Sequence, residues 1–532
     1  MGEVIDGRAA GVHLDLAGGQ RDERFLPSRQ RVEELDHVRI ITRTPGQVNF
    51  SRGPPAHHGK SDPDPGDQVD RTVPFVSYFQ SPKDTFLSPK ISLGIRREDK
   101  NPWERRAPLI PVHARELIRE LSLDVRIQPS PIRVFAEEDY RREGVTVSED
   151  LSSCSFVLAV KEIPLSFFRD ETVYLFFSHT IKGQPHNMPM LKRMMERRAT
   201  LIDYERIVDD EGRRLVFFGR QAGQAGMIDT LWALGQRLRR EGIENPFVDI
   251  RQTIDYASLV EAKEAIQKTG WAIQNQGLDS SLVPLVFGFA GYGHVSQGAQ
   301  EIFDLLPFET VAPGEIEALF KNREYSGKRV YKTVFKEEDM VVPDSGRPGF
   351  DLQDYYRNPG NYRPVLDRFL PCLTVFINAI YWAPQYPRFV TKEFLKTLWG
   401  ETGAPRLRVI GDISCDVEGS VECTVRCTDP AHPVFTYDVD REEAVTGFSG
   451  RGPTVMAVDN LPAEIALESS VFFSQTLKPF IPGLVAADFR ADFDRCRLPA
   501  PLKKAVILFR GEFTPEYTYM REFISATKRS HP

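Results

Sequence analysis

The sequence predicts an α/β fold in which mainly parallel sheets are covered by helices on both faces. From Ile91 onwards, short apolar runs alternate with amphipathic stretches, which is the pattern of repeated strand–helix units. An apolar run at residues 283–289 leads straight into a glycine-rich turn. The chain has 532 residues, of which 41% are hydrophobic and 27% charged. It is therefore long enough for two large domains with extensions, or for three or four smaller domains.

The first alternating series begins at residues 91–95, an apolar run that is expected to form a strand. Apolar spacing predicts helices over residues 113–121 and 187–197. The other apolar runs of this series predict strands at residues 125–130, 155–160, 172–177 and 199–205. A longer amphipathic helix is expected at residues 224–240, and a second alternating series runs from about residue 283 to residue 465.

The first 88 residues differ from the rest, because their apolar runs are short and prolines interrupt them. The segment PPAHHGKSDPDPGDQ has no periodicity, which predicts a largely disordered extension over residues 1–88. Acidic residues near the N-terminus suit neither a secretory signal nor a mitochondrial presequence. We therefore predict no clear targeting signal and expect a cytoplasmic protein or one of the mitochondrial matrix.

Charge and composition exclude several classes of protein. The net charge of -7, from 68 basic and 75 acidic residues, argues against a general nucleic-acid binder. The sequence contains no run of 18 or more apolar residues, so no membrane-spanning helix is predicted. The six cysteines are scattered, which favours free thiols in a reducing compartment. Cys423 and Cys427 lie near His432, but their segment reads as a strand and a fourth ligand is missing, so no metal site is predicted.

The clearest local motif is the glycine-rich turn after the strand at 283–289. It contains Gly288, Gly291, Gly293, Ser296 and Gly298, and a helical stretch follows. Glycines allow a tight turn and let the backbone approach a pyrophosphate, while the helix N-terminus offers unpaired N–H groups. The spacing is not the strict GxGxxG form, but the strand before it and the helix after it predict a dinucleotide site.

The expected nucleotide depends on the end of the next strand. Sites for NAD place an acidic residue about 20 positions beyond the glycines. The next apolar run is at residues 308–311, and it ends at Ala312 and Pro313 rather than at an acid. The missing acid favours NADPH over NADH, with Lys321 and Arg323 as candidate partners of a 2′-phosphate.

Residues 91–525 resemble lysine–2-oxoglutarate reductase, the N-terminal half of bifunctional aminoadipic semialdehyde synthase. More widely, they resemble the alanine dehydrogenase, transhydrogenase and saccharopine dehydrogenase superfamily. The resemblance is carried by GIRREDKNPWERRAPLIP, VLAVKEIP, FFSHTIKGQ, LIDYERIVDDEGRRLVFFG, AGQAGM, GYGHVSQGAQEIF, VIGDISCDVEGSVE and VDNLPAEIALESS. It implies two Rossmann-like domains with a cleft between them. The implied parts are a substrate domain at 89–225, a dinucleotide-binding domain at 226–464 and a segment at 465–532 that returns to the first domain.

Two residues at strand ends are expected to transfer protons. Lys161 follows the apolar run at 155–160 and His179 follows the run at 172–177. Both positions are at carboxyl ends of predicted strands, where α/β proteins place their sites. A partly desolvated lysine can act as a base, and histidine titrates near neutral pH. The resemblance implies that Lys161 and His179 are the catalytic acid–base pair.

The resemblance also implies a set of residues around the substrates. Arg106 and Arg214 match carboxylate-binding arginines, although the neighbouring Arg105 and Arg213 leave each assignment open by one position. Ionisable residues around the implied substrate site are Glu162, Lys182 and Glu205. Asp416 and Asp459 are implied on the nicotinamide side, whereas Asp412 is expected to be structural.

The leading interpretation is a reductase that joins L-lysine to 2-oxoglutarate and reduces the imine to saccharopine with NADPH, or alternatively with NADH. A second is saccharopine dehydrogenase working with NAD in the lysine-forming direction. Alanine dehydrogenase is a third, and a non-catalytic nucleotide-binding relative is a fourth. The sequence leaves open the direction of flux, a homo-oligomer and a separate saccharopine dehydrogenase partner. No nucleic-acid or membrane partner is expected.

Overall fold

The computed structural model describes residues 39–42, 48–51, 91–344 and 349–527. The chain divides into two compact units, residues 1–83 and 84–532. In the first unit, β1 (Arg39–Thr42) pairs antiparallel with β2 (Val48–Ser51). The disorder predicted for residues 1–88 otherwise lies outside the described residues.

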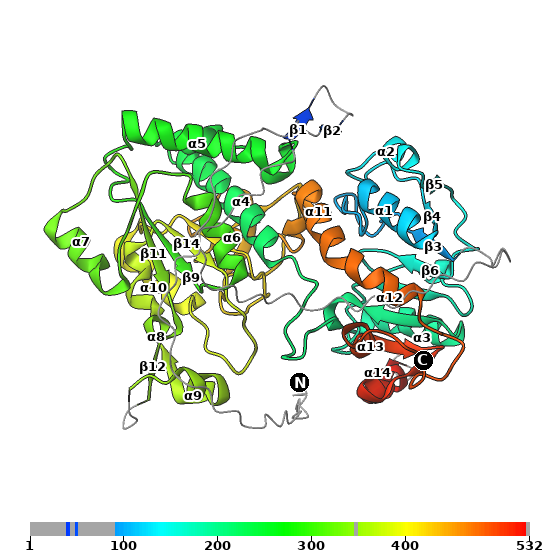
Figure 1. The fold of residues 1–532 in the computed structure, drawn as a ribbon. Coiled ribbons are helices and arrows are strands. Elements are labelled where there is room, and N and C mark those ends of the chain that lie inside the picture. Colours follow the sequence, from blue (N-terminus) through cyan, green and yellow to red (C-terminus); the bar gives the residue numbers. More distant parts are fainter. Residues whose placement is uncertain (1–38, 43–47, 52–90, 345–348, 528–532) are drawn as a thin grey trace, which may run out of the picture. The chain divides into compact units, whose positions relative to one another are not determined.

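The first large sheet of the second unit combines the beginning and the end of that unit. Its strand order is β20-β19-β8-β7-β6-β3-β4-β5. The five pairs from β8 to β5 are parallel, whereas β19 pairs antiparallel with both β8 and β20. The bounds are β3 (Ser92–Ile95), β4 (Asp124–Ile127), β5 (Thr146–Val147), β6 (Phe156–Leu158), β7 (Val173–Phe176), β8 (Thr200–Asp203), β19 (Val506–Phe509) and β20 (Glu512–Phe513). The domain that holds this sheet is therefore discontinuous, and Figure 1 shows the orange and red C-terminal elements beside the cyan ones.

The second large sheet has the strand order β10-β11-β9-β14-β15-β18-β16-β17. It is parallel except where β16 pairs with β17 and β18. The bounds are β9 (Val286–Ala290), β10 (Phe308–Thr310), β11 (Val330–Phe335), β14 (Val375–Asn378), β15 (Val409–Asp412), β16 (Val434–Asp438), β17 (Glu443–Thr446) and β18 (Thr454–Met456). A small sheet of β12 (Val341–Pro343) and β13 (Tyr362–Pro364) is separate.

Helices cover both faces of the second sheet (Figure 1). One core packs α4 (Gly219–Arg240), α5 (Leu259–Gln276) and α6 (His294–Phe303) against one face, and another packs α7 (Ile316–Asn322) and α10 (Lys392–Thr402) against the other. The core of the first sheet includes side chains of α1 (Pro111–Leu121), α3 (Met188–Glu196) and α11 (Ala466–Leu477). The remaining helices are α2 (Glu137–Arg142), α8 (Glu337–Met340), α9 (Leu352–Arg357), α12 (Ile481–Val485), α13 (Ala500–Lys504) and α14 (Arg521–Thr527).

Two glycines let α4 and α6 approach each other closely. A Cβ atom at Gly223 would lie 1.9 Å from the carbonyl oxygen of Val295, and one at Gly298 would lie 2.1 Å from that of Arg220. Side chains at either position would therefore push the helices apart. The AGQAGM segment and the last glycine of the turn are explained by this helix packing, which fixes α6 beneath the glycine turn.

The predicted fold class is confirmed, because both large sheets are dominated by parallel pairs and carry helices. The predicted strands at 91–95, 155–160, 172–177 and 199–205 correspond to β3, β6, β7 and β8. The domain boundaries near residues 225 and 465 stay predictions. No helix in the described part of the chain is both long and apolar enough to cross a membrane.

A chain that begins at residue 89 is expected to fold and to keep its activity. The second compact unit starts at residue 84, and every strand of both large sheets lies after residue 89, so the truncated chain keeps both sheets whole. Soluble yield, thermal unfolding and turnover of residues 89–532 should match those of the full chain. An insoluble truncated protein would contradict this expectation.

Candidate active site

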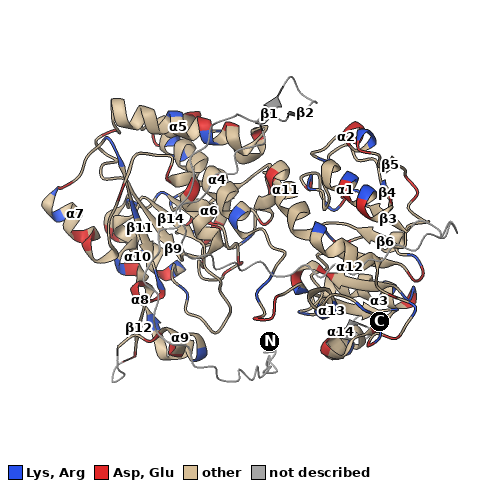
Figure 2. Cartoon of the chain, in the orientation of Figure 1, with Lys and Arg blue, Asp and Glu red and all other residues tan. Residues whose placement is uncertain are grey.

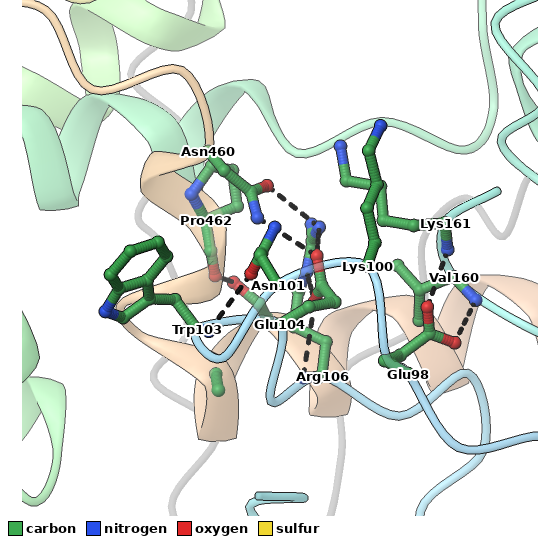
Figure 3. A network of polar contacts seen from close by, with 12 residues as sticks. Glu98, Lys100, Asn101, Trp103, Glu104, Arg106, Val160, Lys161, Asn460 and Pro462 are labelled. Atoms are coloured by element: carbon green, nitrogen blue, oxygen red, sulfur yellow. Dashed lines mark hydrogen bonds and ion pairs between the residues drawn. The ribbon is translucent and has the colours of Figure 1, made fainter. Parts of the chain in front are cut away.

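Glu98 holds the backbone around Lys161. It lies three residues beyond β3, and Lys161 lies three residues beyond the neighbouring strand β6. The backbone N–H groups of Val160 and Lys161 donate to its two carboxylate oxygens at 2.7 and 2.9 Å. Figure 3 shows Glu98 directly beside this segment. Burial raises the pKa of Glu98 to about 7, and the nearby Glu104 adds to the effect.

The surroundings of Lys161 favour the neutral form of its side chain. Its side chain is half-buried, and desolvation lowers the pKa of its ammonium group. The positive charges of Arg106 and Lys100 lower the pKa further, against the opposing effect of Glu104 and Glu162. In Figure 3 the side chains of Lys100 and Lys161 point the same way. A larger fraction of Lys161 is therefore in the neutral amine form near neutral pH than is the case for an exposed lysine.

His179 and Glu162 form a hydrogen-bonded pair beside this lysine. His179 Nδ1 lies 2.8 Å from Glu162 Oε1, and Lys100 Nζ donates to Glu162 Oε2 at 2.6 Å. Burial raises the pKa of Glu162, but the hydrogen bonds of His179 and Lys100 outweigh it and the net shift is downward. Glu162 thus stays ionised and orients the imidazole. His179 has a φ of 47°, and its carbonyl accepts from Asn187 Nδ2 at 3.0 Å.

The end of β8 supports the loop that carries His179. The hydroxyl of Ser178 donates to the buried carboxylate of Asp203, which also accepts from the backbone N–H of Ser178 at 3.2 Å. Burial and the charge of Glu205 raise the pKa of Asp203 to about 6. Glu205 is paired with the half-exposed Arg214 at 3.5 Å. Arg214 is therefore the more accessible of the two predicted carboxylate-binding arginines.

Arg106 is held in a buried polar network (Figure 3). Its guanidinium pairs with Glu104 at 2.6 Å, donates to Asn460 Oδ1 at 3.1 Å and lies over the ring of Phe218. Asn460 Nδ2 also donates to Glu104, at 3.1 Å. Because Glu104 already occupies Nε and one Nη of Arg106, a substrate carboxylate would have to use the other Nη.

Several contacts join these residues to the nucleotide-binding half of the fold. The positive charge of Lys182 lowers the pKa of Asp416, against a larger effect of desolvation that raises it. The ring of Phe217 packs against that of His294, the first residue of α6, at 5.1 Å between centroids. Asp459 is exposed, and it is its neighbour Asn460 that contacts Arg106. Asp416 and Lys182 therefore lie within electrostatic reach of each other, as the resemblance implies for one shared site.

The glycine turn has the shape that a dinucleotide requires. Gly291 has a φ of 92°, and a Cβ there would lie 2.9 Å from Ile380, whereas a Cβ at Gly293 would meet nothing within 4 Å. The turn is thus tight at Gly291 and open above Gly293, where a pyrophosphate can approach the N-terminus of α6. Ser296 is fully buried and its hydroxyl accepts from Gln300, so this hydroxyl is not exposed to a ligand.

The strand order corrects one step in the nucleotide argument. The predicted strand at 308–311 is β10, but it lies at the edge of the sheet, and β11 separates it from β9. Ala312 is therefore not at the end of the strand beside the glycine turn. Lys321 and Arg323 lie at the end of α7, which returns the chain towards the start of β11. They are therefore near the amino ends of the strands, whereas the glycine turn follows the carboxyl end of β9.

The segment that contains Cys423 and Cys427 is not a strand, contrary to the prediction. Residues 421–429 form turns and isolated bridges, with Cys423 buried and Cys427 exposed. Asp412 is buried and accepts from Asn378, from Thr424 and from the backbone of Cys415. This agrees with the structural role expected for Asp412.

Comparison with known proteins agrees with this geometry. Residues 94–225 match the N-terminal domain of the alanine dehydrogenase/PNT family. The chain is 38% identical over 455 residues to alpha-aminoadipic semialdehyde synthase of Arabidopsis thaliana, covering 83% of this chain and 42% of that protein. The chain is a relative of alpha-aminoadipic semialdehyde synthase. It spans less than half the length of that relative.

Two more distant similarities extend over most of the chain. Saccharopine dehydrogenase (NAD⁺, L-lysine-forming) of Emericella nidulans is 25% identical over 403 residues, covering 72% of this chain and 89% of that protein. A solved L-alanine dehydrogenase superposes with a TM-score of 0.54 at 15% identity, covering 82% of this chain and all of that one. The predicted resemblance is confirmed, and among these relatives the semialdehyde synthase is the more similar.

Sequence reasoning missed three residues of this synthase-like site. Glu98, Lys100 and Asn460 contact Lys161, Glu162 and Arg106, respectively. Glu98 and Lys100 follow the first buried strand closely, so charged residues just after an apolar run were an available signal. Asn460 had no local signal, because its partners lie more than 350 positions away.

Substituting Glu98 by glutamine is expected to flatten the pH dependence of stability. The pKa of Glu98 is about 7 in the folded protein and about 4.3 in an unfolded chain. Between these values the folded protein keeps a proton that the unfolded chain has released, so the free energy of unfolding falls as pH rises. Glu98→Gln should remove up to roughly 4 kcal/mol of this fall.

Urea unfolding at several pH values between the unfolded and folded pKa of Glu98 measures this change in the free energy of unfolding. The exposed Glu171→Gln is the matched control, and its pH dependence should equal that of the wild type. Parallel stability curves for Glu98→Gln and the wild type would contradict the assignment.

Proposed function

We propose that the chain is a lysine–2-oxoglutarate reductase that forms saccharopine. The carrying observation is a lysine of lowered pKa, Lys161, beside the Glu162–His179 couple and between basic groups that suit a dicarboxylate. The similarity to alpha-aminoadipic semialdehyde synthase supports this reading over the lysine-forming dehydrogenase. It is also consistent with the oxidoreductase character of the wider superfamily.

The residues divide the work of imine formation and reduction. The ε-amine of lysine must lose a proton before it attacks the carbonyl of 2-oxoglutarate, and Lys161 in its neutral form can accept that proton. His179, oriented by Glu162, can donate a proton to the oxygen that leaves as water. Arg214 can bind a carboxylate through paired N–H donors, and the remaining Nη of Arg106 can donate a further hydrogen bond.

Gly291, Gly293 and the N-terminus of α6 would hold a reduced nicotinamide dinucleotide, which would supply the hydride for reduction of the imine carbon. Asp416 and Asp459 remain the proposed residues on the nicotinamide side. NADPH was expected partly because Ala312, at the end of β10, is not acidic. Because β10 is not adjacent to β9, Ala312 does not bear on the choice of nucleotide. The residues at the end of β11 are instead the ones expected to decide between NADH and NADPH.

A steady-state assay with L-lysine, 2-oxoglutarate and either reduced nucleotide tests the proposal. Nucleotide oxidation that requires both substrates, with saccharopine identified by mass, supports it. Turnover with pyruvate and ammonia would favour alanine dehydrogenase. Nucleotide binding without any turnover would favour a non-catalytic relative. We also propose a separate saccharopine dehydrogenase partner, a homo-oligomer and a location in the mitochondrial matrix or the cytoplasm.

A further inference from the structure

The end of β11 is the part of the sheet where the adenosine end of a dinucleotide would lie. β11 pairs with β9 up to Phe335 and Ala290, and the backbone N–H of Gly291 donates to the carbonyl of Phe335 at 3.0 Å. Neighbouring strands are about 4.8 Å apart, so β11 ends one strand away from the glycine turn and β10 two strands away. In folds of this class the ribose is recognised at the end of the strand adjacent to the glycine-bearing strand.

An oriented carboxylate occupies this position. Glu337 lies two residues beyond β11 and is half-buried. The hydroxyl of Tyr356 donates to Glu337 Oε1 at 2.5 Å. Tyr292 stands between the two glycines of the turn, and burial together with the nearby carboxylate of Glu337 raises the pKa of its phenol. Glu337 thus lies close to the glycine turn, and its remaining lone pairs can accept further hydrogen bonds.

The charge around this position is mainly negative. Glu337, Glu338 and Asp339 form the first turn of α8, and Figure 2 shows acidic residues on that helix. Lys336 is exposed and lies 3.9 Å from Glu338. Lys321 and Arg323 are the partners first expected for a 2′-phosphate, but they precede the start of β11 and so lie near the amino ends of the strands. A 2′-phosphate at the end of β11 would therefore meet carboxylates at close range.

We propose that Glu337 is a specificity-determining residue that accepts the ribose hydroxyls of the adenosine and makes the protein prefer NADH to NADPH. The inference rests on the proposed function only in taking a nicotinamide dinucleotide as the cofactor. A carboxylate accepts hydrogen bonds from the 2′- and 3′-hydroxyls of NADH. The same carboxylate repels the 2′-phosphate of NADPH, and it would be left without those hydroxyl partners.

Direct titration of the full chain with NADH and with NADPH, without substrates, tests this inference. Calorimetry or quenching of tryptophan fluorescence reports binding independently of turnover. The wild type should bind NADH about 10-fold or more tighter than NADPH. Glu337→Ser should weaken NADH binding about 10-fold and tighten NADPH binding, which reverses or abolishes the preference.

Two further variants sharpen the result. Glu338→Ser, one residue along and exposed, should shift the preference much less than Glu337→Ser does. Tyr356→Phe, which removes one hydrogen bond to Glu337, should reduce the preference less than Glu337→Ser does. Tighter NADPH binding by the wild type, or an unchanged ratio in Glu337→Ser, would overturn the assignment. A Glu337-dependent preference in a protein that does not turn over lysine and 2-oxoglutarate would leave this inference standing and remove the proposed function.

Discussion

Lys161→Met is expected to lower kcat by about 10²–10⁴-fold, the usual contribution of a positioned acid or base. Methionine keeps a long, unbranched side chain in the half-buried position but cannot accept a proton. The backbone contacts of residue 161 with Glu98 are retained, because they involve only its N–H group. Nucleotide binding should be almost unchanged, because the glycine turn belongs to the other sheet.

The pH profile separates a catalytic loss from a structural one. Because the pKa of Lys161 is lowered, kcat/KM of the wild type should rise with pH as the amine becomes neutral, and Lys161→Met should lack that limb. Lys192→Met, on the exposed surface of α3, is the matched control and should behave as the wild type. A Lys161→Met protein with near wild-type turnover would exclude this lysine as the base.

His179→Gln is expected to lower kcat by a similar factor of about 10²–10⁴. Glutamine can keep a hydrogen bond to Glu162, but it cannot titrate or deliver a proton. Because Lys161 and His179 act on the same substrate pair, the double variant should lose less than the product of the two single effects. His186→Gln, an exposed histidine seven positions away, serves as the control.

Independent, multiplicative losses in the double variant would show that the two side chains do not act as a unit. Full activity of His179→Gln would remove the histidine from the mechanism, and Lys182 and Glu205 would be the next residues to test. Each variant needs a thermal unfolding measurement, since His179 has a left-handed backbone conformation and accepts a hydrogen bond from Asn187 through its carbonyl.

The placement of the main elements could be read from the sequence. Apolar runs at residues 91–95, 155–160 and 172–177 are strands because each is buried on both faces of its sheet, which leaves a continuous apolar signal. The glycines after residues 283–289 mark a tight turn because Gly291 needs a positive φ. Lys161 and His179 could be predicted as candidates because they directly follow such runs.

The sequence alone determined the strands at residues 91–95, 155–160, 172–177 and 199–205, where the glycine-rich turn lies and which residues stand at the ends of these strands. Only the tertiary structure decided that β11, and not β10, lies beside β9, which moves the nucleotide question from Ala312 to Glu337. It also decided that Arg106 is engaged by Glu104 and by Asn460, 354 positions away. The physical reason is that burial and turn geometry act on neighbouring residues, whereas strand order and ion pairing depend on which distant segments fold together.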